Sequence, residues 1–347
     1  MKKSSPLDCN VNYAGIDYHK KFSVITLGDS KGKVVRTERI INDKHALKTF
    51  FKQYPGVICA VESCRGYEWF LDYLKELGHE VHLVNAYQTK LIAQSRCKTD
   101  KVDSRILMEL LAIGFLPTCY QPTAMERQLR ERLRWRAHLV RLTTRTKLQI
   151  HSLLDKENLG TSIPTLFTLE GRQFLTEVQL SPGRQTLLEQ QVKILDYFES
   201  MVRAEEQWAR HTAKSTPDAK LLMTIPGIGD LTALLIIAEL GDITRFKSTS
   251  QVAAYVGLVP RIRASADSYR IGPITKHGCP HLRWMLVQCA WQAIRYSVPL
   301  RLHFASVSKR CGRNAGIISV ARKLIQIAYR VLRDQKAFES GLVGSSA

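Results

Sequence analysis

Two aspartates three residues apart, Asp100 and Asp103, lie in the segment KTDKVDSR. On a helix this spacing puts both carboxylates on one face. They are either ordinary helix-surface charges or part of a metal site, because carboxylate oxygens are preferred ligands of hard divalent cations. Three neighbouring cations would hold a substrate phosphate beside such metals: Lys98, Lys101 and Arg105.

Two further acids end strands that the sequence predicts. Asp17 closes the strand YAGID, and Glu62 ends the buried strand VICAVES. In an RNase H-like sheet these strands are neighbours and a late helix packs against their ends, so the four carboxylates would converge. Four unneutralised carboxylates repel one another strongly. Two Mg²⁺ ions roughly 4 Å apart would relieve this repulsion and polarise a phosphodiester, so we predict a two-metal site that cuts nucleic acid.

The elements around these acids have the order of an α/β RNase H-like domain, over residues 11–120. Short apolar runs and turn signals predict three antiparallel strands, followed by alternating helices and strands. The predicted strands are 13–17, 22–28, 34–40, 57–63 and 80–84, and the predicted helices are 45–54, 67–77 and 100–113. Several α/β folds share parts of this order, so it indicates the class of fold more firmly than the function.

Residues 121–215 have a helical pattern instead. Two long amphipathic runs, 123–157 and 183–214, predict an antiparallel hairpin or a coiled coil. The first run has an apolar face of Leu129, Leu133, Ala137, Val140, Thr144 and Leu148. It also has a basic stripe of Arg127, Arg130, Arg134, His138, Arg141 and Arg145. The stripe is a solvated face or a phosphate-contacting one, and we favour the second because like charges in line cost a helix about 0.2–0.5 kcal/mol per pair.

Residues 216–340 begin with a helix–hairpin–helix-like element. The segment LLMTIPGIGDLTALLIIAEL places Gly227 and Gly229 between two apolar helices. These glycines form either a tight turn in a core or a turn whose N–H groups approach a phosphate. At the other end of this region, the basic tail 301–336 is expected to be a helix along nucleic acid or a solvated face.

A serine-bearing segment lies between them. Residues 259–278 are expected to form a loop that carries Ser265 and Ser268. Four cations surround these serines and would position phosphates: Arg261, Arg263, Arg270 and Lys276. A serine hydroxyl in such a loop can attack a phosphodiester, because arginines stabilise the charge that develops at phosphorus.

The composition indicates a polyanionic partner. The formal net charge is +20, of which +5 falls in residues 1–120 and +15 in the remainder. Such an excess predicts salt-dependent binding of DNA or RNA. The eight cysteines form no C-x-x-C pair, so no zinc knuckle is expected. The longest apolar run, 231–240, is too short to span a bilayer, and we expect a cytoplasmic, nucleoid-associated protein with no membrane partner.

Two separated blocks of motifs resemble a known family. The front block holds GIDYHK, AVES and KTDKVDSRIL, and the rear block holds IPGIG, TALLIIAELGDITRF, YVGLVPR and IGPITKHG-x-x-x-LR. In this order they resemble the DEDD transposases of bacterial insertion sequences, the "IS one-ten" family, which also includes the Piv-type DNA invertases. The resemblance covers about residues 13–337.

The resemblance implies a RuvC-like N-terminal domain and a C-terminal transposase domain with an essential serine. The family's acidic tetrad falls on Asp17, Glu62, Asp100 and Asp103, and its serine falls on Ser265. Ala266 and Asp267 stand where the family usually has glycines, so Ser268 remains a second candidate. The resemblance also implies a covalent phosphoserine link to DNA, dimers that pair into tetramers, and a structured non-coding RNA that guides the choice of DNA.

Three readings follow from these patterns. The first is an Mg²⁺-dependent transposase that uses both the tetrad and a serine, with a Piv-type invertase as its close variant. The second is a RuvC-like junction endonuclease in which the tetrad activates water and the serine is structural. The third is a non-catalytic nucleic-acid-binding protein whose acids are surface charges.

Overall fold

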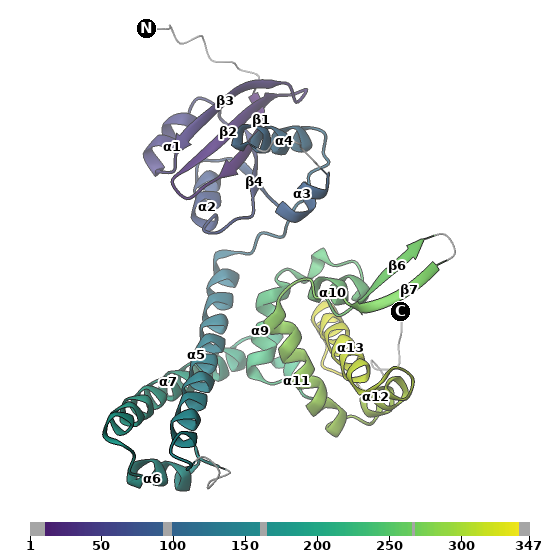
Figure 1. Cartoon of the computed structure of the whole chain (residues 1–347). Coiled ribbons are helices and arrows are strands. Elements are labelled where there is room, and N and C mark those ends of the chain that lie inside the picture. The colour runs from purple at the N-terminus through teal and green to yellow at the C-terminus, as the bar shows by residue number, and fades with distance from the viewer. Residues whose placement is uncertain (1–10, 93–98, 160–164, 266–267, 340–347) are drawn as a thin grey trace. The chain divides into compact units, whose positions relative to one another are not determined.

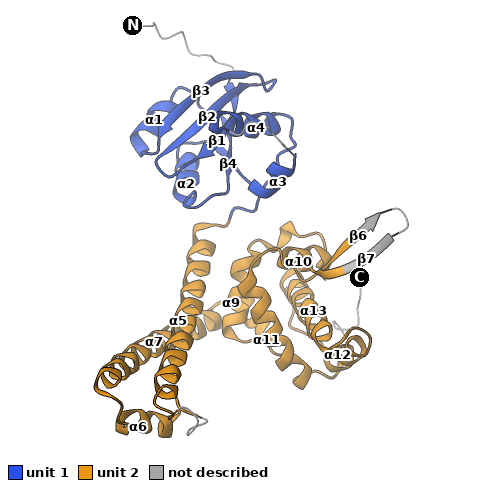
Figure 2. Cartoon of the chain, in the orientation of Figure 1, with its two compact units in different colours: residues 1–121 blue, residues 122–347 orange. Residues whose placement is uncertain are grey.

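The computed structural model describes residues 11–92, 99–159, 165–265 and 268–339. The chain divides into two compact units, Met1–Gln121 and Pro122–Ala347 (Figure 2). The boundary lies close to the one expected after residue 120. The segments expected at 121–215 and 216–340 both fall in the second unit.

The first unit is built on a five-stranded mixed sheet (Figure 1). Its strands are β1 Val11–Tyr18, β2 Phe22–Asp29, β3 Val34–Ile41, β4 Ile58–Glu62 and β5 Glu80–Val84. The sheet order is β3-β2-β1-β4-β5; β1, β2 and β3 pair antiparallel, and β4 pairs parallel with both β1 and β5. All five predicted strands are confirmed. The strand ends that carry Asp17 and Glu62 are therefore neighbours, at the carboxyl ends of two parallel strands.

Four helices accompany this sheet. They are α1 Lys44–Phe51, α2 Glu68–Glu76, α3 Ala86–Ile92 and α4 Asp100–Ala112. The aromatic and aliphatic side chains of α1 and α2 pack with Ile16, Ile25 and Val61 in one buried core. The opposite face of the sheet receives α4, whose Leu107 packs with Ala60. Helix α3 is the one element of this unit, within the described residues, that we did not predict.

Helix α4 lies unusually close to β1. A Cβ on Gly15 would stand 2.0 Å from the backbone oxygen of Ser104 and 2.4 Å from the backbone nitrogen of Met108. The Ser104 hydroxyl is also 2.8 Å from the Thr26 hydroxyl, in a buried hydrogen bond. Because side chains alternate along a strand, Gly15 and Asp17 share the face of β1 that α4 covers. Glycine at position 15 is thus what lets α4 approach the end of β1 where Asp17 lies.

The second unit begins with a helical hairpin. Helices α5 Ala124–Asp155 and α7 Pro182–Ser215 pack along each other and are joined through α6 Leu169–Glu177. A capping box of Thr123 and Glu126 fixes the start of α5. The two predicted helical runs are confirmed. The buried side chains at the far end of the hairpin are Ile150, Leu153, Leu154, Leu166, Leu175, Leu188 and Leu195.

The apolar face predicted for α5 is only partly correct. Leu133 is buried, but Leu148 is 64% exposed, and α5 buries Leu139 and Ile150 instead. Sequence spacing located the apolar positions, yet α5 turns a different stripe toward α7. The stripe of Ala137, Val140, Thr144 and Leu148 is left lining a groove.

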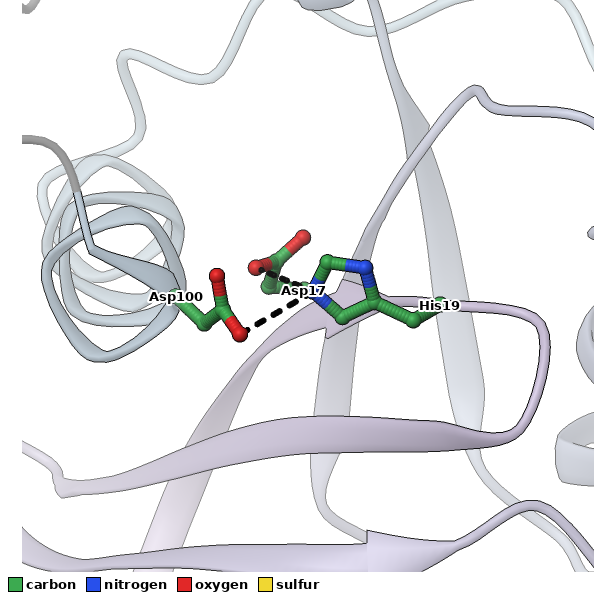
Figure 3. A group of neighbouring side chains, drawn as sticks. All are labelled: Asp17, His19 and Asp100. Carbon is green, nitrogen blue, oxygen red and sulfur yellow. Dashed lines mark hydrogen bonds and ion pairs between the residues drawn. The ribbon is translucent and has the colours of Figure 1, made fainter.

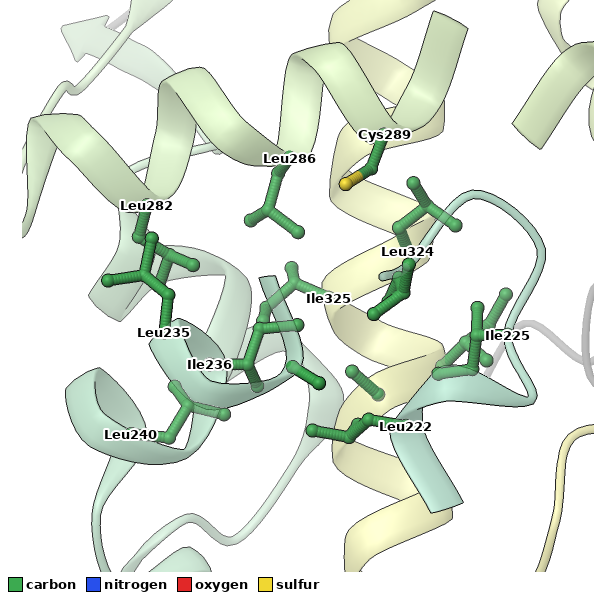
Figure 4. Close-up of a cluster of buried hydrophobic side chains, with 14 of the residues drawn as sticks. Leu222, Ile225, Leu235, Ile236, Leu240, Leu282, Leu286, Cys289, Leu324 and Ile325 are labelled. Atoms are coloured by element: carbon green, nitrogen blue, oxygen red, sulfur yellow. The ribbon is translucent and has the colours of Figure 1, made fainter. Parts of the chain in front are cut away.

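The remainder of the second unit is a helical domain with one hairpin. Its elements are α8 Pro217–Met223, α9 Asp230–Leu240, the 3₁₀ turn η1 Ile243–Arg245, α10 Thr249–Val256, β6 Pro260–Ser265, β7 Ser268–Ile274, α11 Pro280–Tyr296, α12 Val298–Cys311 and α13 Arg313–Asp334. Side chains of α8, α9, α11 and α13 interlock in the largest buried cluster of the chain (Figure 4). No described helix has the length and apolarity needed to cross a membrane.

Two expectations for this domain are wrong. The segment expected to be a loop at 259–278 contains an antiparallel hairpin, in which β6 and β7 pair from Pro260↔Ile274 to Ser265↔Ser268. The basic tail at 301–336 is not one helix on a surface, because Gly312 separates α12 from α13. Helix α13 buries 11 residues and lies in the core, with its apolar side chains at helical spacing between the cations. The expectation rested on the number of cations in this segment and did not consider the apolar stripe between them.

Candidate active site

The strongest candidate for a catalytic centre lies at the end of β1. Here Asp17, His19 and Asp100 point toward one another (Figure 3). His19 Nε2 stands 3.2 Å from Asp17 Oδ2 and 3.3 Å from Asp100 Oδ2. One ligand atom from each residue lies within 4.8 Å of the other two. Two carboxylates and an imidazole at this spacing form a donor set that a divalent metal ion can use.

The electrostatics of Asp17 show that the other acids are close. Burial is the main cause that raises the pKa of Asp17 to about 6; His19 acts against it, and the negative charges of Asp100, Asp103 and Glu62 contribute to the rise. Its side chain is only 12% exposed, so solvent screens these charges weakly. The other three acids predicted from sequence are thus near enough to act on Asp17. A raised carboxyl pKa from burial and like charge is typical of functional sites.

Glu62 and Asp103 face the same small space. They line a cavity of about 50 Å³ together with Lys90 of α3 and Leu107 of α4. Asp100 instead lines a larger, open cleft of about 980 Å³ with Lys101 and Phe22. Three acids of the tetrad therefore line spaces beside α4, Glu62 and Asp103 in one and Asp100 in the other.

Local sequence explains how α4 presents its acids. Thr99 caps the helix, its hydroxyl accepting from the Val102 backbone N–H. Asp100 and Asp103 are in the first turn of α4, where the helix dipole favours negative charge. This placement stabilises the helix in the absence of any ligand, and it also aims both carboxylates at the end of the sheet.

His19 is a site residue that the sequence reasoning missed. It stands two residues beyond Asp17, in the motif GIDYHK, just after β1 ends. Its ring also lies 4.7 Å from the ring of Phe22, which fixes its position over the strand ends. The signal was available: a histidine at an even spacing from a candidate ligand shares its face.

The serine hairpin is a second candidate feature. The register places Ser265 opposite Ser268, one on each side of residues 266–267, which lie outside the described part of the chain. The structure describes no side chain of residues 263–271, so the roles of Arg263 and Arg270 stay predictions.

Arg283 anchors the base of this hairpin, and it too was missed. Its Nη1 donates to the backbone oxygens of Val256 and Gly278, each at 3.1 Å. Arg261 Nη2 reaches the backbone oxygen of Thr275 at 3.4 Å across the strands. Arg283 is the last residue of the motif HG-x-x-x-LR, so the sequence did mark it. Its contact with the base of the hairpin becomes evident only in the fold.

Comparison with known proteins bears on both candidate features. Residues 14–158 match a transposase model of the DEDD type of IS110, and residues 219–305 match the model described as the transposase IS116/IS110/IS902 family. The chain belongs to this family of transposases. The two matches together hold all four acids and both serines.

Relatives of this transposase align along most of their length. It is 27% identical to the transposase for insertion sequence element IS1328 of Yersinia enterocolitica, over 95% of this chain and 99% of the relative. It is 24% identical to the transposase for IS1111A of Coxiella burnetii, over 96% and 92%. The pilin gene-inverting protein of Moraxella bovis is 28% identical over 75% of each chain.

The arginine stripe of this transposase is partly committed to its own fold. Arg130 donates from Nε to the Ala238 backbone oxygen at 2.5 Å and from Nη2 to the Glu239 backbone oxygen at 3.3 Å. Arg134 pairs at 3.0 Å with the carboxylate of Glu239, which is 4% exposed. Arg127 donates to the Pro122 backbone oxygen at 2.8 Å. Contacts within the fold therefore account for these three arginines, and their contact with nucleic acid stays a prediction.

The glycines of the helix–hairpin–helix-like element differ from each other. Gly227 has φ +85°, and a Cβ there would stand 2.4 Å from the backbone oxygen of Cys289 in α11. Packing in the core therefore accounts for Gly227. Gly229 is exposed, precedes α9, and has open space where a Cβ would point. Of the two, Gly229 is the one whose surroundings leave room for a phosphate.

The remaining predicted cations lie near the tetrad or the hairpin. Lys101 is exposed at the cleft beside Asp100. Arg105 pairs with Glu109 at 3.5 Å along α4. Lys276 adopts φ +59°, just beyond the hairpin. Lys98 lies outside the described residues.

Proposed function

We propose that this transposase cuts and rejoins DNA strands to move an insertion sequence, and that the chemistry needs both the acidic tetrad and Ser265. The observation that carries the proposal is the convergence of Asp17, His19 and Asp100, with Glu62 and Asp103 close by. The sheet order β3-β2-β1-β4-β5, with three antiparallel strands followed by two parallel ones, supports an RNase H-like, RuvC-like fold for the first unit.

The residues fit a divalent metal, for which Mg²⁺ is our candidate. Four carboxylates would hold up to two ions, and His19 offers a fifth donor. Such ions, when bound, polarise the phosphodiester and stabilise the charge of both the attacking and leaving oxygens. Burial of Asp17 keeps water away from one side of the site, and α4 holds Asp100 and Asp103 against the strand ends.

The serine would supply the nucleophile. Its Oγ forms a bond to phosphorus, its proton passes to a base in the site, and one strand oxygen leaves as a hydroxyl. Attack by a second strand's hydroxyl then reverses the step, releasing the serine and joining the strands. Arg261 and Lys276, with Arg263 and Arg270, would position phosphates, and Ser268 is the alternative nucleophile at the same end of the hairpin.

Family resemblance supports two further parts of the proposal. A structured RNA from the element would select DNA by base pairing while the protein holds backbones. Chains would pair as dimers and tetramers, with the α5–α7 hairpin as a coiled-coil contact. The likeness to pilin gene-inverting proteins favours DNA inversion as a second candidate outcome of the same chemistry.

The test is a search for a covalent adduct. The full chain is incubated with Mg²⁺, DNA carrying the gene's native flanks, and RNA transcribed from those flanks, and denaturation-resistant adducts are mapped by mass spectrometry. We expect an adduct on Ser265 that both Ser265→Ala and Asp17→Ala abolish, while Glu177→Ala, which removes an exposed acid of α6, has no effect. Cleavage without an adduct, surviving Ser265→Ala but not Asp17→Ala, would show a metal-dependent hydrolase instead.

A further inference from the structure

A groove between α5 and α11 has no role in the chemistry proposed above. Its volume is about 640 Å³. Its floor includes the uncovered apolar stripe of α5, with Val140 and Leu148, and one wall is Trp284 of α11, which is 55% exposed. Exposed aliphatic and indole surface gathered in one groove is typical of a binding site.

The charges around this groove are of one sign. Four arginines line it: Arg134, Arg136, Arg141 and Arg145. Arg134 pairs with Glu239 and Arg136 with Glu206, so their charges are balanced inside the fold. Arg141 and Arg145 are exposed and, among the described residues, have no carboxylate within the 4.0 Å of an ion pair. No acid lines the described groove, so an anionic ligand would meet two unpaired cations there.

The aromatic wall is arranged for stacking. Trp284 lies nearly parallel to the ring of His281, with 6.4 Å between centroids and 25° between planes, and its own ring remains largely open. His281 Nδ1 is buried without a hydrogen-bond partner among the described atoms. Burial and the nearby arginines Arg136, Arg141 and Arg134 lower the pKa of His281 against the opposing effect of Glu239, and this lowering favours the neutral ring.

We propose that this groove binds an unpaired nucleotide of a single strand, with the base stacked on Trp284 and its phosphates at Arg141 and Arg145. An apolar, aromatic floor suits a base, and two cations one helical turn apart, about 6 Å along α5, suit successive phosphates. A duplex hides its base faces, so the groove would select single strands. The proposal rests on the proposed function, in which such strands occur as opened DNA or as the guide RNA.

The test is equilibrium binding without catalysis. The full chain in EDTA is titrated into labelled oligothymidylate, the matching oligouridylate and a duplex of equal length, and the anisotropy is followed. Base stacking of roughly 1–3 kcal/mol makes us expect Trp284→Ala to weaken single-strand binding about tenfold, and Trp284→Phe much less. Arg141→Ala with Arg145→Ala should lower the slope of log affinity against log salt by about 1.4, at roughly 0.7 per phosphate. The thymidylate and uridylate arms show which strand the groove prefers.

A charge-matched control isolates the groove from general basicity. Lys193→Ala with Arg203→Ala removes two exposed cations of α7 that do not line the groove. If that pair of changes costs as much affinity as the groove pair, or if Trp284→Ala leaves affinity unchanged, the proposal is wrong. A change in oligomeric state of Trp284→Ala by light scattering, with single-strand affinity intact, would make the groove a contact between copies and also overturn it.

The outcome is separable from that of the proposed function. Asp17→Ala should bind oligonucleotides as the unmodified chain does, because Asp17 lies in the other unit and binding is measured without metal. If Trp284→Ala leaves the single-strand affinity unchanged while the unmodified chain still cleaves DNA, only this inference is refuted. Cleavage that persists in Asp17→Ala refutes the proposed function and leaves the binding result standing.

Discussion

Replacing Asp17 by Asn should stabilise the metal-free protein while removing its metal site. Burial raises the pKa of Asp17 to about 6, from the 3.8 of a free side chain. The folded chain therefore holds a proton on Asp17 that the unfolded chain has already lost, between pH 3.8 and 6. Folding stability falls with rising pH wherever the native state binds more protons, so ionised Asp17 destabilises the first unit at neutral pH.

The magnitude follows from the size of the shift. Each pKa unit corresponds to about 1.36 kcal/mol, so the shift of roughly two units costs about 3 kcal/mol at pH 7.5. Because the Asp17 side chain is only 12% exposed, screening by water reduces this little. At pH 5 the native carboxyl is mostly protonated, and only about half of the cost is present. Asp17→Asn removes this charge, so the variant lacks this destabilisation.

Hydrogen exchange resolves the effect within one unit of the chain. Amides of β1 and β4 are followed by mass spectrometry in EDTA, at pH 5 and at pH 7.5. We expect the free energy of unfolding measured by exchange to be higher for Asp17→Asn than for the unmodified chain. The difference should be about 3 kcal/mol at pH 7.5 and about half that at pH 5. Saturating Mg²⁺ should reverse the ranking, since ligand binding stabilises only a chain that retains its site.

A matched change in the same sheet provides the control. Asp29 is partly exposed, and its carboxylate accepts from the backbone N–H groups of Lys31 and Lys33, each at 2.9 Å, which lowers its pKa. Asp29→Asn should therefore fail to stabilise the unit at pH 7.5. If Asp17→Asn were destabilising in EDTA at pH 7.5, or if its effect were the same at both pH values, the electrostatic account of the site would be wrong.

Three further changes test how the sites are built. Gly15→Ala should destabilise the first unit by about 3 kcal/mol or more, measured by urea unfolding, because the added methyl group would overlap the α4 backbone. Gly56→Ala is the control: its Cβ points into open space, so this change costs only the backbone strain at positive φ. His19→Ala should weaken the binding of Mn²⁺ about tenfold or more, as measured by calorimetry, because it removes a metal ligand. Unchanged affinity would show that His19 is not a ligand. Arg283→Ala should leave the helical content unchanged by circular dichroism but increase hydrogen exchange of the β6 and β7 amides, because it removes the donor to the Val256 and Gly278 carbonyls. Unaltered exchange would show that other contacts hold the hairpin.

Most of the first unit could be predicted from the sequence, because its elements are short and locally specified. Short apolar runs and turn signals marked the strands, and Gly78 and Gly114 marked helix ends, where the structure gives both glycines positive φ. The four acids were found because strand ends and a helix face are local properties. His19 and Arg283 were missed because their partners, Asp100 and the carbonyls of Val256 and Gly278, are distant in the sequence or carried by the backbone.

The errors in the second unit share one physical cause. Periodicity gives the apolar positions of a helix but not which neighbour covers them. The stripe of α5 with Val140 and Leu148 is apolar yet uncovered, while α13, taken for a basic surface helix, buries its apolar side against α11. The segment with Ser265 was read as a loop because cross-strand pairing is a contact between residues, not a property of either strand.

The sequence by itself determined the five strands of the first unit, the two long helices, the basic charge, the family motifs and the residue types able to bind a metal. Tertiary structure alone decided how Asp17, His19 and Asp100 meet, which arginines serve the fold, and which remain unpaired beside Trp284. The reason is that periodicity and capping act over a few residues, whereas burial, a raised pKa and an open groove depend on segments that the fold alone brings together.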